Sequence, residues 1–489
     1  MVKEVRGVTS VLGITFKELS LLPGFTTKDC TIQNISLETK LAENLVLKIP
    51  FLSAAMQSVT GYEMALALGK EGGMGILPMG LSIKEQVSII KKIKEHEPSF
   101  VKMPISVREY ETVGEVIKKI EVYGHSRIPV VDVDNTFLGI FTLPNFFKKQ
   151  PDLEEKVTNV MTPFSKDAEP YSLNEPVPYV SDNLSIEEVK NLFESNGHQR
   201  YLVLLDDLGR LRGLAFKKDI EKINIGSAIS THRGWKERVK ENIEAGTDLI
   251  VIDTSDAYNE FTSDVIKDYK SMGIKIPICA GNIVTYEGAR YLMEAGADII
   301  KVGMSSGSMC TTKSQKAVGR APMTALIEAG KARDDYYKAK QRYVPLIMDG
   351  GIENAADMII TLTIADGGMM GYYFNRFYEA VGEKFDENGN FTNKENEIRH
   401  VRIFGEGSKE AWNLRRYGHT PTTFFEEGVS GKVPYVGRLK PNLKEDLSKI
   451  KAALVNSGCM NLEEFRKNSV IELISPRAQG DLNTTYKIS

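Results

Sequence analysis

Short apolar runs that end in Gly, Ser or Asp recur along the chain and alternate with amphipathic stretches. Continuous apolar runs of about four to eight residues are typical of strands that are buried on both faces of a sheet. Eight such runs predict strands, at residues 51–56, 73–79, 226–230, 249–255, 276–282, 299–304, 344–351 and 367–373. The stretches between them predict helices, clearest at 235–246, 285–296 and 355–367, and each of these ends at a glycine, the usual C-terminal stop.

The alternation of strands and helices predicts a parallel sheet, because parallel neighbours need a crossover connection between them. Eight strand–helix units predict an α/β fold of the (β/α)8 TIM-barrel type. In such a barrel the polar residues that follow the strands gather at one end, where catalysis takes place.

The alternation is interrupted between residues 100 and 223, where two similar units follow one another, at 105–149 and 179–222. Both carry the pattern G-H-x-R before an apolar strand. An internal repeat inside a barrel indicates an inserted module. We therefore expect the barrel at 1–99 and 224–489 and the module at 100–223. The repeat resembles a tandem CBS pair (a Bateman module), either as an inert insert or as a sensor of adenine or guanine nucleotides.

Composition narrows the function classes. The 489 residues exceed one ordinary core, and 62 basic against 65 acidic residues give a net charge of −3, which does not favour a polyanion-binding surface. No apolar run is long enough for a membrane span, and the N-terminus has no run of the signal-peptide type. The four cysteines form no CxxC pair and the six histidines no HExxH motif, so we expect a reduced, cytoplasmic protein without catalytic zinc.

The segment GMSSGSMCTT, residues 303–312, is the strongest chemical signal. It follows a predicted strand, and its small residues allow backbone N–H groups to converge on an anion. Cys310 stands in this loop between hydroxyl-bearing residues, whereas Cys279 falls inside an apolar strand, as expected for a core thiol. We therefore predict that Cys310 is a nucleophile.

Several ordered motifs resemble the IMP dehydrogenase family. These are GxxxGSxCTT after one strand, DGGI after a later one, and an Arg-Tyr pair ahead of EEGVxGxVPY. The resemblance covers nearly the whole chain, including LLPGF, SAAMQSVTG and the segment MTPFSK. The AMQSV and WNLRRY segments look closer to the protozoal branch of the family.

The resemblance implies that the enzyme oxidises IMP to XMP with NAD⁺, the committed step of guanine nucleotide synthesis. Cys310 would form a covalent thioester with the purine, and hydrolysis would release XMP. Thr312 would help to hold the water. Arg416, beside Tyr417 on a mobile flap at about 375–430, would act as the base.

The resemblance also assigns ligand contacts. For IMP these are Ser53, Met56, Ser308, Asp349, Gly350, Gly351, Gly371, Tyr372, Gly405, Glu406, Gly407, Ser408 and Glu427. For NAD they are Asp253, Thr254, Ser255, Asn282 and Gly303, with Arg233 and Phe261 on either side of the adenine. A monovalent cation, K⁺, would bind the carbonyls of Ser305, Gly307 and Cys310 in a homotetramer.

Some positions keep a structural alternative. Asp349 could cap a helix, Ser53 and Met56 could be barrel packing, and Phe261 could be a helix core residue. The sequence also departs from the family at Tyr372, where small or basic residues are usual, and in its C-terminal tail, which does not clearly match the segment that completes the K⁺ site.

Two other functions compete with the dehydrogenase. GMP reductase shares the barrel, the cysteine loop and the DGG strand, but uses NADPH and needs no base such as Arg416. A nucleotide-sensing scaffold would use the CBS pair alone, and the set of Cys310, Thr312, Arg416 and Tyr417 argues against it.

Overall fold

The computed structural model describes residues 12–96, 100–123, 127–165, 177–195, 200–217, 223–304, 307, 312–413 and 428–475. The chain divides into two compact units, one made of Met1–Glu95 with Ile223–Ser489 and the other of His96–Lys222. Within the described residues, none of the helices combines the length and the apolar character needed to cross a membrane.

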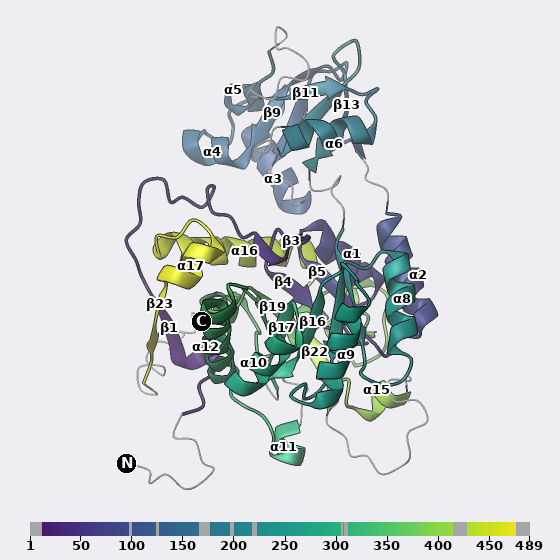
Figure 1. Ribbon diagram of the computed structural model, residues 1–489. Helices are drawn as coiled ribbons and strands as arrows, with labels where there is room; N and C mark the ends of the chain where they lie inside the picture. Colours follow the sequence, from purple (N-terminus) through teal and green to yellow (C-terminus); the bar gives the residue numbers. More distant parts are fainter. Residues whose placement is uncertain are drawn as a thin grey trace. The chain divides into compact units, whose positions relative to one another are not determined.

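The first unit is built on a closed barrel of eight parallel strands, in the order β14-β15-β16-β17-β18-β19-β4-β5 (Figure 1). This confirms the predicted TIM barrel. The strands are β4 Phe51–Ser53, β5 Met74–Leu77, β14 Ile225–Ile229, β15 Leu249–Asp253, β16 Ile278–Ile283, β17 Ile299–Val302, β18 Leu346–Asp349 and β19 Gly367–Met370.

Helices surround the barrel. They are α1 Tyr62–Lys70, α2 Ile83–Lys94, α8 Trp235–Ala245, α9 Glu260–Ser271, α10 Tyr286–Ala295, α12 Pro322–Lys340, α13 Ala355–Leu362 and α16 Leu439–Asn456. Helix α16 packs against both α13 and α1, so it closes the ring of helices although it lies far along the chain from β19. The residues between β19 and α16 are therefore an excursion at the carboxyl end of the barrel.

Glycines end two of the predicted helices. Gly246 and Gly296 follow α8 and α10 with φ angles of 101° and 105°, the left-handed conformation that glycine adopts without steric cost. The third prediction was wrong at its end: α13 stops at Leu362, and Gly367 begins β19. The predicted strand 367–373 likewise ends at Met370, because residues from Tyr372 onward form the short helix α14.

Alternate side chains of the strands enter two different cores. Ile250 and Ile252 of β15 belong to the cluster between the barrel and its helices. Leu249 and Val251 belong to a second cluster that also contains Leu45 of the hairpin β2–β3. This second cluster fills the barrel interior with apolar side chains near the amino ends of the strands, which leaves polar residues to the carboxyl ends.

Smaller elements complete the first unit. They are η1 Phe16–Glu18, β1 Leu19–Leu22, β2 Thr39–Ala42, β3 Leu45–Leu47, α11 Thr312–Lys316, α14 Tyr372–Asn375, β20 Lys384–Phe385, η2 Glu395–Glu397, β21 His400–Phe404, α15 Lys409–Asn413, β22 Ser430–Pro434, α17 Leu462–Asn468 and β23 Val470–Leu473. Strand β1 pairs antiparallel with β23, and β20, β21 and β22 form a three-stranded sheet.

The second unit contains two four-stranded sheets, β10-β9-β8-β7 and β11-β12-β13-β6. Its elements are β6 Val101–Lys102, β7 Val107–Arg108, α3 Val113–Tyr123, β8 Arg127–Val131, β9 Phe137–Thr142, α4 Leu143–Lys149, α5 Val157–Val160, β10 Thr162–Pro163, β11 Tyr179–Ser181, α6 Ile186–Ser195, β12 Tyr201–Leu205 and β13 Leu211–Phe216. Each sheet contains an antiparallel pair of consecutive strands, preceded by a helix.

The two sheets of this unit are joined at their turns. Phe137 N donates to Gly209 O over 3.0 Å, and Leu211 N donates to Asn135 O over 3.0 Å. Residues of both sheets, among them Phe137 and Leu211, share one hydrophobic cluster. The two halves of the repeat therefore form a single folded unit.

Candidate active site

A buried lysine organises the polar residues at the carboxyl end of the barrel. The side chain of Lys301, on β17, is only 1% exposed. Its Nζ donates to Asp349 Oδ2 over 2.7 Å and to Asp253 Oδ1 over 3.0 Å, and it also donates to Asn282 Oδ1. The cluster therefore joins the ends of β15, β16 and β18 around one cation.

The carboxylates keep this lysine charged. Burial of the ammonium group works against its charge, but Asp253 and Asp349 outweigh burial and raise the pKa of Lys301 above the ordinary lysine value. Because the three side chains are fixed by ion pairs, the two carboxylates present a rigid pair of acceptors to the open end of the barrel.

Sequence reasoning missed Lys301. The available signal was a single lysine inside the apolar run IIKVGM, since a lysine is almost never fully buried without a partner. The parallel register places Lys301 beside Gly281 of β16 and Ile347 of β18. Asn282 follows Gly281 directly, and Asp349 follows Ile347 by two residues. The partners of a buried lysine in this strand had to be side chains at the ends of the neighbouring strands.

Asn282 connects the residues predicted for NAD with Asp349, predicted for IMP. Its Nδ2 donates to Gly303 O over 2.6 Å and to Asp349 Oδ2 over 3.0 Å. Thr254 Oγ1 donates to Gly281 O over 3.2 Å, which holds the end of β15 against β16. The structure thus brings Asp253, Asn282, Gly303 and Asp349 together. Helix α13 is capped by Asn354, so the capping alternative for Asp349 was wrong.

The loops after β18 and β19 contain glycines predicted to contact IMP. Gly350 and Gly351 have φ angles of 82° and 80°, a conformation that strains other residues. A methyl group at Gly371 would lie 2.6 Å from the Sδ of Met56, so these two residues touch. The positions predicted from the first and last barrel strands therefore meet at one place.

Ser53 is buried in the barrel and accepts a hydrogen bond from Thr60 Oγ1 over 2.8 Å. Its hydroxyl oxygen is therefore engaged inside the protein, as the packing alternative for this residue predicts.

The GEGS segment, residues 405–408, is held by side chains at both ends. Glu406 accepts from Gln57 N over 2.6 Å and from Gln57 Nε2 over 3.3 Å, which ties the segment to the loop after β4. Ser408 Oγ accepts from Ala411 N over 3.3 Å and caps α15. The Glu406 and Ser408 side chains thus fix the segment, and Gln57, which the sequence analysis did not single out, is part of it.

The residues predicted for the adenine of NAD lie on the surface. Phe261, in the first turn of α9, is 75% exposed, so the alternative that it is a helix core residue was wrong. Arg233 and Ser255 are exposed as well. An exposed aromatic ring is available for stacking, whereas a buried one is not.

Three of the four cysteines are core residues. Cys30, Cys279 and Cys459 are free thiols and are buried. Burial raises the pKa of Cys279 to about 12, although Lys301 acts in the opposite direction, so this thiol stays protonated. Gly303 and Gly307 are described, and the backbone of Thr312 begins α11. The other predicted residues lie outside the described residues: Ser305, Ser308, Cys310, Arg416, Tyr417 and Glu427.

The described chain resumes at Gly428 beside residues 405–408. Gly405 N donates to Val429 O over 3.0 Å. A methyl group at Gly428 would lie 3.1 Å from Ser408 N. Gly428 and Val429 therefore pack against residues 405–408.

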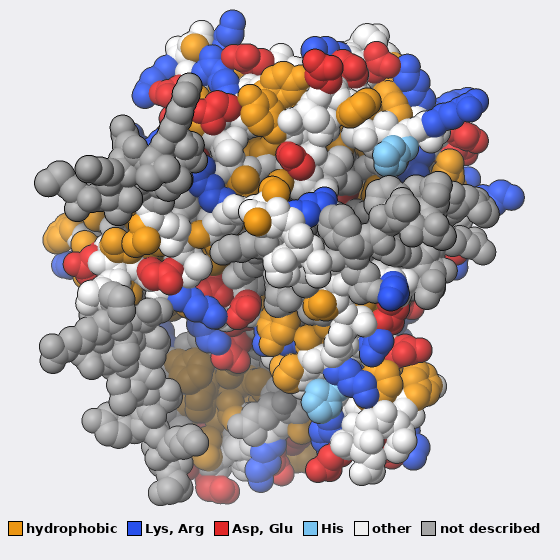
Figure 2. All heavy atoms as spheres, turned by 90° about the horizontal axis from the view of Figure 1, so that it is seen from below, with side chains coloured by type: hydrophobic (Ala, Val, Ile, Leu, Met, Phe, Trp, Pro, Cys, Tyr) orange, Lys and Arg blue, Asp and Glu red, His pale blue; other side chains and the backbone are white. Residues whose placement is uncertain are grey.

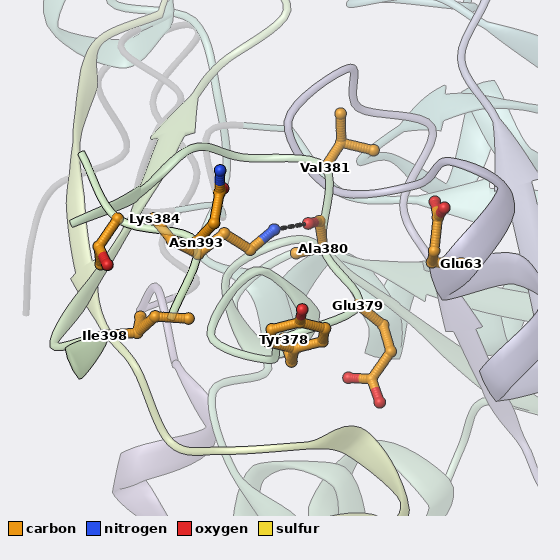
Figure 3. Close-up of a pocket in the computed structure, with 9 residues that line it drawn as sticks. Glu63, Tyr378, Glu379, Ala380, Val381, Lys384, Asn393 and Ile398 are labelled. Carbon is orange, nitrogen blue, oxygen red and sulfur yellow. Dashed lines mark hydrogen bonds between the residues drawn. The ribbon is translucent and has the colours of Figure 1, made fainter. Parts of the chain in front are cut away.

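A cavity of about 400 Å³ lies elsewhere, between the start of α1 and residues 378–398 (Figure 3). Its lining residues are Glu63, Tyr378, Glu379, Ala380, Val381, Lys384, Thr392, Asn393 and Ile398. Burial lowers the pKa of Lys384, whose amine donates to Ala380 O, while Glu63 and Glu379 act in the opposite direction. None of the predicted site residues that the structure describes lines this cavity.

The face seen from below Figure 1 carries α11 and α15. On its coloured part, acidic and basic side chains are interspersed (Figure 2). Such a distribution agrees with the net charge of −3 and suits a pocket for a small anion better than a surface for a polyanion.

Comparison with known proteins gives a consistent result. Residues 13–483 match the model of a family described as the IMP dehydrogenase / GMP reductase domain. The inosine-5'-monophosphate dehydrogenase of Tritrichomonas foetus is 34% identical over 94% of this chain and 93% of its own length. The proteins of that name from Methanocaldococcus jannaschii and Aquifex aeolicus are 32% and 29% identical, over 95% and 94% of this chain and 93% and 92% of their own lengths.

A solved structure shares the fold. It is a GMP reductase variant from Trypanosoma brucei in complex with guanosine 5'-monophosphate, with a TM-score of 0.67 and 24% identity, covering 97% of this chain and 98% of that chain. At this identity the likeness concerns the fold alone.

Proposed function

This chain belongs to the IMP dehydrogenase / GMP reductase family, and on that premise we propose that it oxidises IMP to XMP with NAD⁺ as the hydride acceptor. The observation that carries the proposal is the Lys301 cluster, which holds together the carboxylates predicted for the two ligands. Relatives named as IMP dehydrogenases from a protozoan, a bacterium and an archaeon, each matched over most of its length, support the same reaction.

We propose that Cys310 performs the chemistry. Its thiolate adds to carbon 2 of the purine, and a hydride leaves that carbon. Water then adds to the same carbon of the covalent intermediate, the C–S bond breaks, and XMP leaves with the thiolate restored. The burial of Cys30, Cys279 and Cys459 supports this choice, because a thiol buried in the core cannot reach a substrate.

The hydrolytic step needs a base, and we assign it to Arg416, with Tyr417 beside it and Thr312 holding the water. A guanidinium has a pKa above about 12 in water, so this role requires a site from which solvent is excluded. The position of Gly428 beside Gly405 supports this assignment, because Arg416 and Tyr417 stand shortly before Gly428 in the chain.

IMP is expected across the loops after β4, β18 and β19. Asp349 would accept hydrogen bonds from the ribose hydroxyls, and the glycines Gly350, Gly351 and Gly371 would admit the phosphate close to the backbone, with Ser308 as a further donor. The residues 405–408 and Glu427 would contact the hypoxanthine. Since Glu406 and Ser408 bond to the protein itself, the backbone of this segment is the part left for the base.

NAD⁺ is expected on the neighbouring strands. The nicotinamide, when bound, accepts the hydride. Asp253, Thr254, Ser255, Asn282 and Gly303 would hold its ribose, and the exposed ring of Phe261 and the exposed Arg233 would stack on the adenine. The exposure of both side chains fits this use.

A bound cation and contacts between subunits are expected to complete the enzyme. We expect K⁺ on the backbone carbonyls of Ser305, Gly307 and Cys310, and Gly307, half-buried with open space beside its Cα, is compatible with this. We also expect a homotetramer, and the exposed apolar side chains on the paired strands β1 and β23 support contact between subunits. The free thiols support a reducing, cytoplasmic setting.

We also propose that His96–Lys222 is a CBS pair that binds an adenine or guanine nucleotide. Its two similar halves, joined at their turns into one unit, support this assignment. The inert-insert alternative remains a separate outcome of a binding experiment with ATP, ADP and GTP.

The reaction itself is tested with IMP and NAD⁺. NADH absorbance should rise with time, and XMP should accumulate in equal amount. Consumption of NADPH with GMP, and no NADH with IMP, would establish the reductase instead. If the protein binds nucleotides but catalyses neither reaction, the nucleotide-sensing scaffold is the function that agrees with the result.

Replacing Cys310 separates covalent catalysis from binding. In Cys310→Ala we expect turnover to fall by ~10³-fold or more, the order of loss seen for a covalent nucleophile, with IMP affinity largely kept. Mass spectrometry of wild-type enzyme quenched during turnover should show the nucleotide on Cys310, and Arg416→Ala should accumulate this adduct after a normal hydride burst. An active Cys310→Ala variant would remove the cysteine from the mechanism.

A further inference from the structure

The last two barrel strands, β18 and β19, are followed by loops that often hold phosphate in (β/α)8 barrels. In this chain those loops are rich in glycine: Gly350 and Gly351 follow β18, and Gly371 follows β19. Backbone N–H groups can donate to a phosphate, but they bring no full charge. The residue after Gly371 is Tyr372, which brings none either.

Arg376 lies between these two loops. Its guanidinium Cζ is 5.1 Å from the centre of the Tyr372 ring and 5.5 Å from that of Tyr373. On the other side, its Nη2 donates to Glu353 O, in the segment after β18, over 3.3 Å. The guanidinium is thus held by contacts from both loops.

The charge of Arg376 is not neutralised by a carboxylate within ion-pair distance in the described part of the chain. The nearby acids are engaged elsewhere: Glu353 pairs with Lys17 at 3.5 Å, and Asp446 accepts from Tyr373 OH over 2.7 Å. The Nε of Arg376 is buried and has no hydrogen-bond partner. The guanidinium is half-buried, and its exposed part has no counter-ion among the described residues, so an anion bound there would neutralise it.

We propose that Arg376 supplies the positive charge that binds the phosphate of the purine mononucleotide, and that Tyr372 holds the guanidinium in place by stacking. The ligand class is a phosphate monoester dianion. The assignment rests on the proposed function for the identity of the nucleotide. The proposal also accounts for Tyr372. A basic side chain at this position, just after the last strand, would itself supply the charge. In this chain the position holds an aromatic ring, which stacks on the guanidinium of Arg376 from the next helical turn.

Binding of matched ligands tests the proposal. We compare wild type with Arg376→Gln by calorimetry, using IMP and its phosphate-free counterpart inosine. The dissociation constant of IMP should rise by roughly 10- to 100-fold, the effect of one charge-assisted hydrogen bond, while that of inosine should not change. Inorganic phosphate should compete with IMP on the wild type and only weakly on the variant.

Arg438→Gln is the matched control, because Arg438 also stacks on a tyrosine, Tyr378, at 4.5 Å but pairs with Glu395 at 2.7 Å. It should leave IMP binding unchanged. Placing the charge directly after the strand, by Tyr372→Arg in the Arg376→Gln background, should restore IMP affinity. Circular dichroism and the thermal midpoint verify that each variant is folded.

Equal loss of IMP and inosine affinity, or no loss of either, would overturn the proposal. Because calorimetry measures binding and not turnover, a failure of the Arg376 proposal can be distinguished from a failure of the proposed reaction. If the enzyme is a reductase, the same selective loss appears with GMP against guanosine, while the NADH assay with IMP fails.

Discussion

At the scale of single residues, Lys301 contributes both to stability and to the position of the predicted ligand-binding carboxylates. It is the buried cation between Asp253 and Asp349, whose side chains are 16% and 20% exposed. Removing a buried partner leaves the remaining charges uncompensated, which costs more than the pair contributed. Lys301 therefore supports both the fold and the proposed ligand contacts.

We predict that Lys301→Met lowers the free energy of unfolding by about 3 kcal/mol, the lower end of the range for a broken buried ion pair, since the carboxylates keep some solvent. The dissociation constants of IMP and NAD⁺ should both rise. Urea denaturation and calorimetry measure the two effects. Lys270→Met, which removes a more exposed lysine from Asp298 before β17, is the control and should leave both ligands unaffected.

The pH dependence of this effect follows from the raised pKa. A lysine whose pKa is higher in the folded state stabilises fully below its unfolded pKa of about 10.4, and the stabilisation is lost as the pH rises through the folded value. The stability difference between wild type and Lys301→Met should therefore be constant between about pH 6 and pH 9. A difference that disappears within this range would show that Lys301 is not held as a cation.

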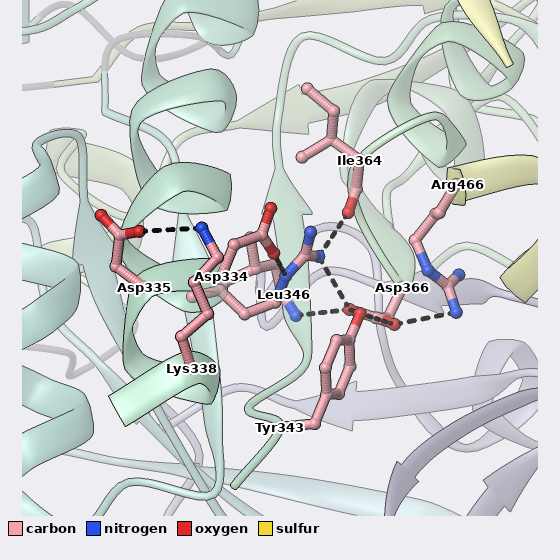
Figure 4. A network of polar contacts seen from close by, with 9 residues as sticks. Asp334, Asp335, Lys338, Tyr343, Leu346, Ile364, Asp366 and Arg466 are labelled. Atoms are coloured by element: carbon pink, nitrogen blue, oxygen red, sulfur yellow. Dashed lines mark hydrogen bonds and ion pairs between the residues drawn. The ribbon is translucent and has the colours of Figure 1, made fainter. Parts of the chain in front are cut away.

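At the scale of elements, Asp366 joins the C-terminal helix α17 to the amino end of the barrel (Figure 4). It accepts from Leu346 N over 2.8 Å and from Tyr343 OH over 3.0 Å. Arg466 of α17 lies at 3.2 Å and Arg333 of α12 at 3.8 Å. Because the amino end of a TIM barrel serves stability rather than catalysis, this network is structural.

We predict that Asp366→Asn lowers the free energy of unfolding by about 3 kcal/mol, because two largely buried guanidinium groups lose their carboxylate. The KM values for IMP and NAD⁺ should not change. Lys338→Gln is the control: its pair with Asp335 is 3.4 Å long and exposed, so it should change stability by less than about 0.5 kcal/mol. A loss of activity in folded Asp366→Asn protein at unchanged stability would contradict the structural assignment.

At the scale of the whole molecule, residues His96–Lys222 interrupt the chain of the barrel unit, but they do not interrupt its hydrophobic core. Lys94 Nζ donates to Ile223 O over 2.7 Å, and Ile93 and Ile223 share one hydrophobic cluster. The two edges of the interruption therefore meet within the barrel unit, so the barrel does not need the second unit to be complete.

We predict that replacing residues 96–222 by a short Gly/Ser linker leaves the barrel folded and the kcat with IMP and NAD⁺ within about twofold of the full chain, because the core contacts of the barrel are retained. Steady-state assays and gel filtration measure this outcome. Any response of the full chain to adenine or guanine nucleotides should be absent from the shortened protein. A shortened protein that is folded but inactive would show that the second unit takes part in catalysis.

The sequence by itself determined the eight strands, the barrel and the helix ends at Gly246 and Gly296. These features depend on short-range patterns: continuous apolar runs, amphipathic periods and a glycine that adopts a left-handed conformation. It also indicated that Asp253, Asn282 and Asp349 would share one end of the barrel, because parallel strands end at the same edge. The family motifs then assigned those positions to ligands.

Only the tertiary structure decided what these residues do to one another. Lys301 is 48 positions from both Asp253 and Asp349, and only closure of the barrel brings the three together. Exposure is likewise a property of the assembled fold: Phe261 lies on the surface, whereas Ser53 is buried and hydrogen-bonded. The position of α16 in the ring of helices also depends on the assembled fold, because it packs against α13 and α1. The physical reason is that local patterns fix which elements form, whereas long-range packing fixes which side chains meet and which remain in solvent.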